Sequence, residues 1–202
     1  MAEKIDVSGV SIKNFPENGE ISPINAGIWH NYYLYTGKLA EQELDWSDDY
    51  RVWLDYMLGK AQKSEDDGVL PSGSMPYINE IYNTLNDAIN YQDFDPTINR
   101  LKEIFEGLSN DIKFNKTALV SVASVSYYSS LFWSEINIIE PNGSTSKIRI
   151  PRWLKVVVKD VAGAISGGYS GMQIGVYLGG PTGAAVGLGV GAVAGGVAGS
   201  LS

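Results

Sequence analysis

The stretch that decides the fold is residues 161–202, VAGAISGGYSGMQIGVYLGGPTGAAVGLGVGAVAGGVAGSLS, which contains no charged side chain. Ten glycines recur in it at every fourth position: Gly163, Gly167, Gly171, Gly175, Gly179, Gly183, Gly187, Gly191, Gly195 and Gly199. A glycine inside a helix costs about 0.5–1 kcal/mol relative to alanine, so such a row needs a compensating interaction. Close approach of two helix backbones supplies one, because a row of glycines forms a groove. The pattern therefore predicts a glycine zipper in which these ten residues pack helices together.

The middle of this stretch, Gly179-Gly180-Pro181, predicts a break in the helix. Proline has no amide hydrogen and clashes with the preceding turn, but it fits the first turn of a new helix. We expect two helical arms, from Pro151 to about Gly179 and from Pro181 to about Leu201. Their uncharged parts are about 28 and 33 Å long at 1.5 Å per residue. Each is close to the roughly 30 Å hydrocarbon thickness of a bilayer. Insertion into a membrane or packing in an oligomer is the favoured interpretation, with a soluble hairpin or a flexible tail as alternatives.

Charge is unevenly distributed along the chain. The net charge is −8, but residues 1–146 carry −12 and residues 147–202 carry +4. The five basic residues of the second part precede the glycine row: Lys147, Arg149, Arg152, Lys155 and Lys159. A basic collar beside an apolar segment suits an anionic membrane surface; the alternative is that it offsets the acidic body within one fold. The acidic body argues against a nucleic-acid partner, because phosphate binding needs a basic face.

Apolar residues at helical spacing predict about five helices upstream. They are expected at residues 25–39, at 46–63, from Pro76, from Asp95 (as N-cap), and at 117–134. The last of these, TALVSVASVSYYSSLFWS, is uncharged and apolar on nearly all sides. Its five interspersed serines favour a helix buried in the core over a membrane span. The sequence predicts an all-α protein: an irregular segment (1–24), an acidic helical bundle (25–146), and the basic collar with its glycine-zipper hairpin (147–202).

No catalytic constellation is evident. The chain has no cysteine, and His30 is its single histidine, so neither a thiolate site nor a histidine metal site can form. We expect His30 to be a core or capping residue rather than a catalytic one. The sequence predicts no enzyme activity, no cofactor or metal, and no evident small-molecule substrate. The start, Met-Ala-Glu-Lys-Ile-Asp, lacks the apolar region of a signal peptide.

Three groups of residues carry a resemblance. They are Trp29-His30-Asn31 with Leu34, the Ser/aromatic-rich residues 120–133, and Trp153-Leu154-Lys155 leading through Asp160 into the glycine-rich end. In these places the chain resembles a group of uncharacterised Bacteroidota proteins. The resemblance implies a lineage and an exported or membrane-associated location, but no activity. The missing signal peptide departs from the exported pattern.

The overall plan is also similar to pore-forming bacteriocin domains of colicin type, which hide an apolar helical hairpin among amphipathic helices. The leading functional prediction is a membrane-active, bacteriocin-like or pore-forming protein that acts through the C-terminal hairpin. Its partners would be a lipid membrane or further copies of itself. The alternative is a soluble structural or interaction protein whose glycine-zipper tail drives self-assembly or docks a partner.

Overall fold

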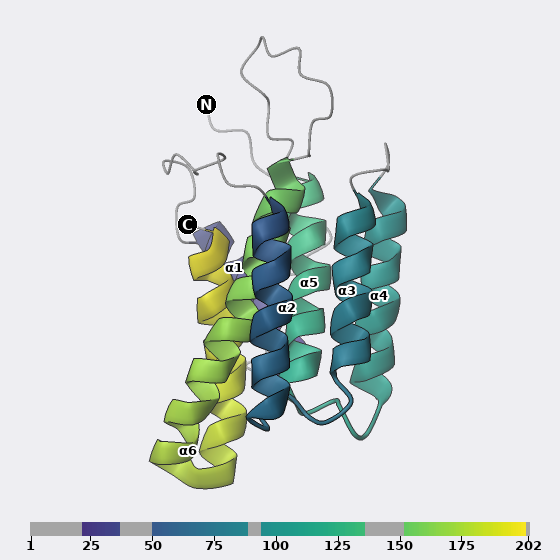
Figure 1. The fold of residues 1–202 in the computed structure, drawn as a ribbon. Coiled ribbons are helices and arrows are strands. Elements are labelled where there is room, and N and C mark those ends of the chain that lie inside the picture. Colours follow the sequence, from purple (N-terminus) through teal and green to yellow (C-terminus); the bar gives the residue numbers. More distant parts are fainter. Residues whose placement is uncertain (1–21, 37–49, 89–93, 136–151, 201–202) are drawn as a thin grey trace.

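The computed structural model in Figure 1 describes residues 22–36, 50–88, 94–135 and 152–200. Side-chain surroundings are described within these ranges, except at positions 33–36, 50, 135, 152–153, 173–186, 188–189 and 199–200. A short 3-10 turn, η2 (Pro23–Asn25), precedes six helices: α1 (Ala26–Thr36), α2 (Tyr50–Asp66), α3 (Met75–Asp87), α4 (Asp95–Asn110), α5 (Ala118–Glu135) and α6 (Arg152–Ser200). No strand occurs in these ranges, so the predicted all-α class is confirmed.

Helices α3 and α4 form an amphipathic pair beside α2 and α5 (Figure 1). The predicted apolar stripes of both helices face inward, and Ile78, Ile81 and Leu101 are almost fully buried. Pro76 lies in the first turn of α3, as predicted. Asp95 is the first residue of α4 rather than its N-cap, which is Phe94, so that detail of the prediction was wrong by one position. An acidic residue in the first turn still complements the helix dipole.

Helix α5 is a buried core helix, as predicted. Five of its serines are fully buried: Ser121, Ser124, Ser126, Ser129 and Ser130. Two of them, Ser126 and Ser130, donate their hydroxyl hydrogens to carbonyls one turn earlier in the helix. Ser124 instead ties down the start of α1, because its hydroxyl donates to the carbonyl of Ile24 (2.7 Å) and accepts from the amide of Gly27 (2.9 Å). Buried hydroxyls therefore serve as internal hydrogen-bonding groups.

Helix α6 passes through the bundle and then reverses direction (Figure 1). We call residues 154–171 the inner arm and residues 187–198 the outer arm. The inner arm packs on α2 and α5 and shares their core through Leu154, Val161 and Ile165. The outer arm lies at the edge, where Ala192 and Val193 pack on α1 and α5 while Val190 is 45 % exposed.

The reversal of α6 lies between the two arms. It extends past the ends of α2 and α5 in Figure 1. The backbone is helical throughout Arg152–Ser200, so the break predicted at Gly179-Gly180-Pro181 is not seen as an interruption of helical structure. The segment predicted as residues 147–202 is thus joined to the bundle through its inner arm, and only the outer arm and the reversal lie at the periphery.

Candidate functional site

The two arms of α6 meet through glycines. A Cβ atom placed on Gly163 would lie 2.1 Å from the carbonyl oxygen of Gly195. The corresponding distance is 2.1 Å from Gly167 to the oxygen of Gly191, and 2.1 Å from Gly171 to that of Gly187. Real Cβ contacts essentially never fall below 3.0 Å, so a side chain at these positions would push the arms apart. We call these six residues the glycine seam.

Six of the ten glycines of the predicted row lie in this seam. Its pairing is antiparallel, since glycines progress toward the C-terminus on one arm and toward the N-terminus on the other. The other four glycines of the row, Gly175, Gly179, Gly183 and Gly199, belong to α6, but their surroundings lie outside the described side chains. Their predicted packing role stays a prediction.

A buried polar cluster lies beside the seam, where α1, α5 and α6 meet. Asp160 of the inner arm is its centre: Oδ2 accepts hydrogen bonds from the Ser129 hydroxyl (2.5 Å) and from the Trp133 indole N–H (2.9 Å). The Nε2 atom of His30 lies 3.4 Å from the same oxygen. Asp160, His30 and Ser129 are each 0 % exposed. A buried carboxylate requires this kind of hydrogen-bonded surrounding.

His30 is held from the other side by its neighbour in α1. Its Nδ1 atom lies 3.0 Å from Oδ1 of Asn31, whose amide group donates to the carbonyl of Tyr128 (2.7 Å). Its Nε2 atom makes no hydrogen bond of good geometry, so the contact with Asp160 is an ion-pair distance rather than a hydrogen bond. The outer arm covers the ring, because a Cβ on Gly196 would lie 2.8 Å from Cδ2 of His30.

This cluster does not have the arrangement of a hydrolytic triad. The Ser129 hydroxyl donates to Asp160 instead of to the histidine, and the three side chains are sealed from solvent. A nucleophile must be within reach of both its base and a substrate. The prediction that His30 is a core residue is therefore confirmed by its burial. Asp160 was missed as its partner, although it is the one acidic residue after residue 146 and borders the glycine-rich segment.

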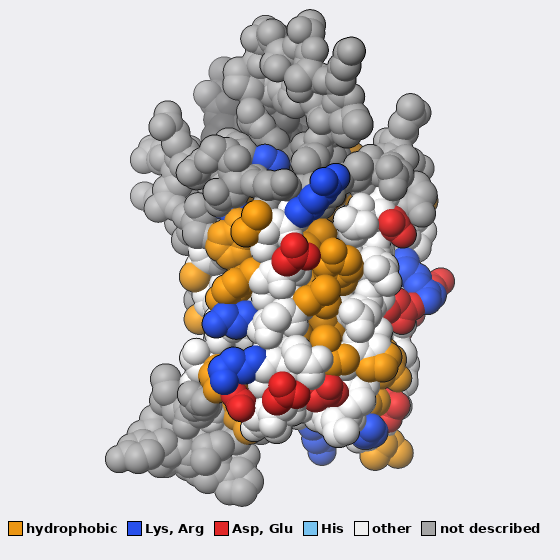
Figure 2. Space-filling model, viewed as in Figure 1, with side chains coloured by type: hydrophobic (Ala, Val, Ile, Leu, Met, Phe, Trp, Pro, Cys, Tyr) orange, Lys and Arg blue, Asp and Glu red, His pale blue; other side chains and the backbone are white. Residues whose placement is uncertain are grey.

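Two of the five side chains of the predicted basic collar, Lys155 and Lys159, are described, and neither is fully exposed. Lys159 is only 6 % exposed, and its ammonium lies 5.3 Å from the centre of the Trp53 ring, which is a cation–π contact. Lys155 is half-buried. Lys147 and Arg149 lie outside the described residues, as does the side chain of Arg152. On the face seen in Figure 2, Lys and Arg side chains are spread out rather than gathered.

A separate hydrogen bond, away from the buried cluster, joins the far end of the inner arm to the residue that follows α2. The Tyr169 hydroxyl donates to Oδ2 of Asp67 (2.8 Å), and the Lys63 ammonium lies 3.0 Å from the same oxygen. The bond from Tyr169, followed by that from Lys63, lowers the pKa of Asp67. Beyond this point along the inner arm, Ser170 is exposed, so the contact lies where α6 leaves the bundle.

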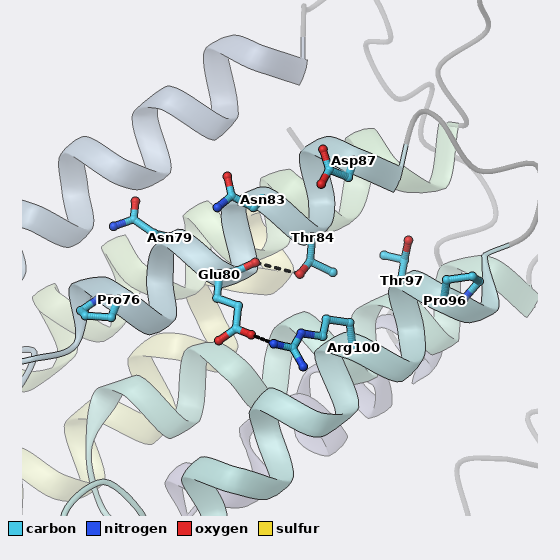
Figure 3. A pocket seen from close by; sticks show the side chains of 9 residues that line it. All are labelled: Pro76, Asn79, Glu80, Asn83, Thr84, Asp87, Pro96, Thr97 and Arg100. Atoms are coloured by element: carbon cyan, nitrogen blue, oxygen red, sulfur yellow. Dashed lines mark hydrogen bonds and ion pairs between the residues drawn. The ribbon is translucent and has the colours of Figure 1, made fainter.

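A groove of about 490 Å³ lies between α3 and α4 (Figure 3). Asn79, Asn83 and Asp87 follow one face of α3, and an ion pair between Glu80 and Arg100 spans the groove. All three residues on α3 are exposed, and no aromatic side chain lines the groove. The groove therefore has the character of a solvated polar surface.

Comparison of the chain with family models, with curated proteins and with solved structures finds no significant match. Over the described ranges, no helix is long and apolar enough to cross a membrane. Within those same ranges, no group of three or more His, Asp or Glu side chains could hold a metal ion. The geometry therefore has to carry any functional proposal, and its distinctive parts are the glycine seam, the protruding reversal of α6 and the buried cluster.

Proposed function

We propose that this is a membrane-active protein, bacteriocin-like or pore-forming in character, which engages lipid through the hairpin formed by the two arms of α6. The observation that carries the proposal is the position of the reversal. A helical segment without charged residues projects beyond the ends of the other helices (Figure 1). A projecting segment without charge favours contact with an apolar phase.

The helical backbone of this segment suits such contact. In a bilayer every backbone N–H and C=O group must be satisfied internally, and the helical backbone of the two arms suits this requirement. Glycine and alanine make each single arm only moderately apolar. The hairpin would therefore contact lipid with its two arms paired, because close backbone packing in the glycine seam holds the arms together. The inner arm would remain anchored by the core and by Asp160.

A charge placed in the reversal tests this proposal. Val176→Glu adds a carboxylate within residues 173–186, and Val52→Glu makes the same change on α2, where Val52 is 65 % exposed. A charged side chain near the bilayer centre costs about 2.5–3.5 kcal/mol, or roughly 100-fold in partitioning. Val176→Glu should therefore suppress dye release from anionic and from neutral liposomes, while Val52→Glu should not. Equal release by both variants would disprove membrane action through the hairpin.

The second candidate is a soluble structural or interaction protein that assembles by exchanging the outer arm between copies. What favours it is that the two glycine rows are already complementary within the chain. The outer arm of a second copy would make the same contacts. Leucine at Gly171 and Gly191 should abolish lipid-independent oligomers in buffer while helicity is retained. Light scattering after size exclusion would measure this, and unchanged oligomers would eliminate the zipper as the cause of assembly.

A further inference from the structure

The protonation of His30 follows from its neighbours. The Asn31 amide nitrogen donates to the Tyr128 carbonyl, and the reverse orientation would bring two oxygens to 2.7 Å. Oδ1 of Asn31 must therefore face Nδ1 of His30, which lies 3.0 Å away. Since that oxygen can only accept, Nδ1 carries a hydrogen. In a neutral ring the remaining nitrogen, Nε2, would then be a bare lone pair.

The other side of the ring meets an acceptor. Oδ2 of Asp160 already accepts hydrogen bonds from Ser129 and Trp133, which suits a carboxylate oxygen. A bare Nε2 would place its lone pair 3.4 Å from the electron-rich Oδ2 of Asp160, in a site with no access to water. A hydrogen on Nε2 converts this repulsion into attraction, which is stronger in a low-dielectric interior. The neighbours of the ring therefore favour a hydrogen on each of its nitrogens.

We infer that His30 is an imidazolium buried in the protein core, paired with the Asp160 carboxylate, and that this pair is a proton-dependent latch for the outer arm of α6. The role of the latch rests on the proposed function, in which the hairpin engages lipid. Loss of the proton from Nε2 leaves a bare lone pair against a carboxylate. Gain of a proton by Asp160 leaves an unpaired buried cation. Either change destabilises the site.

The pair is coupled to the outer arm by direct contact. A Cβ on Gly196 would lie 2.8 Å from Cδ2 of His30, and 3.4 Å from both Nε2 and the Asp160 carbonyl oxygen. The arm thus lies on the ring with no space between them. Movement of the ring, or water admitted to solvate an unpaired charge, would displace the arm at this point. Closely packed interiors respond to such changes by discrete shifts.

The described groups from α5 and the outer arm that face the pair are uncharged. The described side chains that α5 contributes are the neutral Ser129 and Trp133, and the outer arm has no ionisable residue. Inside the described ranges, Asp160 is the group within ion-pair distance of the ring. Its neighbour Lys159 lies over Trp53. A pH-dependent loosening of the outer arm is assigned to the His30–Asp160 pair where it coincides with the titration of the His30 ring signals.

The test uses the full chain with isotope-labelled histidine, because a single histidine provides one set of ring signals. At neutral pH, NMR should find both ring nitrogens protonated. Where the ring loses its second proton, hydrogen-exchange protection of residues 187–198 should fall by about 100-fold or more, while residues 101–108 of α4 stay protected. A ring with one protonated nitrogen at neutral pH, or unchanged protection of 187–198 through the titration, would overturn the inference.

Two variants provide independent evidence. Asp160→Asn can retain an acceptor oxygen for Ser129 and Trp133 but removes the negative charge that faces His30, so protection of 187–198 should no longer follow histidine titration. Gly196→Ala should shift the His30 ring signals and lower protection of 187–198. Gly107→Ala is the control, because its Cβ would meet nothing within 4 Å. Retained pH dependence in Asp160→Asn, or unmoved ring signals in Gly196→Ala, would contradict the latch.

Dye release measured on the same samples separates the two proposals. If the latch opens with pH as inferred but liposomes stay intact in the open state, the proposed membrane function is wrong and the latch stands. If liposomes leak while protection of 187–198 does not depend on the protonation of His30, the latch is wrong and the membrane function stands.

Discussion

A single methyl group in the glycine seam provides a sharp test of the close helix contact. In Gly195→Ala the new Cβ would lie 2.1 Å from the Gly163 carbonyl oxygen and 2.8 Å from the Gly167 Cα. Ordinary contact begins at 3.4 Å, so the arms must separate by more than 1 Å here. Because both obstacles are backbone atoms, no side-chain rotation relieves the clash.

The expected change in the free energy of unfolding follows from two opposing effects. Overpacking of this kind costs about 1–3 kcal/mol, whereas replacing a helical glycine by alanine gains about 0.5–1 kcal/mol from helix propensity. Gly107→Ala in α4 isolates the second effect, since Gly107 is exposed and its Cβ would meet nothing within 4 Å. Both variants share the propensity gain, so we expect Gly195→Ala to be less stable than Gly107→Ala by the overpacking cost, about 1–3 kcal/mol.

Urea unfolding followed by circular dichroism measures the global effect. Hydrogen exchange of residues 187–198 measures opening of the outer arm alone, because a peripheral segment can open without unfolding of the bundle. The close-contact reasoning would be refuted if Gly195→Ala matched Gly107→Ala in unfolding free energy and also left exchange of 187–198 unchanged.

Two further predictions concern the attachment of α1 and of the inner arm. Ser124→Ala should lower the unfolding free energy by about 1–3 kcal/mol, because the Gly27 amide loses its partner in a buried site. Urea unfolding measures this free energy, and an unchanged value would mean that the hydrogen bond does not anchor α1. Hydrogen bonds from Tyr169 and then from Lys63 lower the pKa of Asp67. These bonds stabilise the fold at pH values above the ordinary carboxyl pKa, and this stabilisation is lost as the pH falls through the lowered pKa of Asp67. Tyr169→Phe should therefore unfold with a shallower dependence on acid pH than the parent chain, and identical pH profiles would show that the bond contributes nothing.

Much of the secondary structure could be predicted because apolar periodicity is a local property. The stripes of α3 and α4 recur at helical spacing, and burial follows from that spacing alone. The serine-rich α5 was also predicted as a core helix, since an uncharged helix that is apolar all round must be covered. The N-cap of α4 was misplaced by one residue, because boundaries depend on local backbone angles that a pattern does not specify.

The candidate site was less accessible to sequence reasoning. His30 and Asp160 are separated by 130 residues, and no spacing rule connects positions so distant. Nothing in the local sequence distinguishes Asp160 from a solvent-exposed polar residue at the end of the basic collar. Lys159 was expected at a surface, yet its neighbours along the inner arm belong to the core, and its stem packs there with its charge over Trp53.

By itself, the sequence determined that the chain is helical and that its C-terminal glycines recur at a spacing made for close backbone contact. These properties depend on backbone preference and side-chain size, which each residue carries locally. Only the tertiary structure decided which glycines face one another and that the inner arm belongs to the core. It alone placed Asp160 between Ser129, Trp133 and His30. Burying a charge requires partners from several helices at once, and their meeting is a property of the packed bundle rather than of any segment.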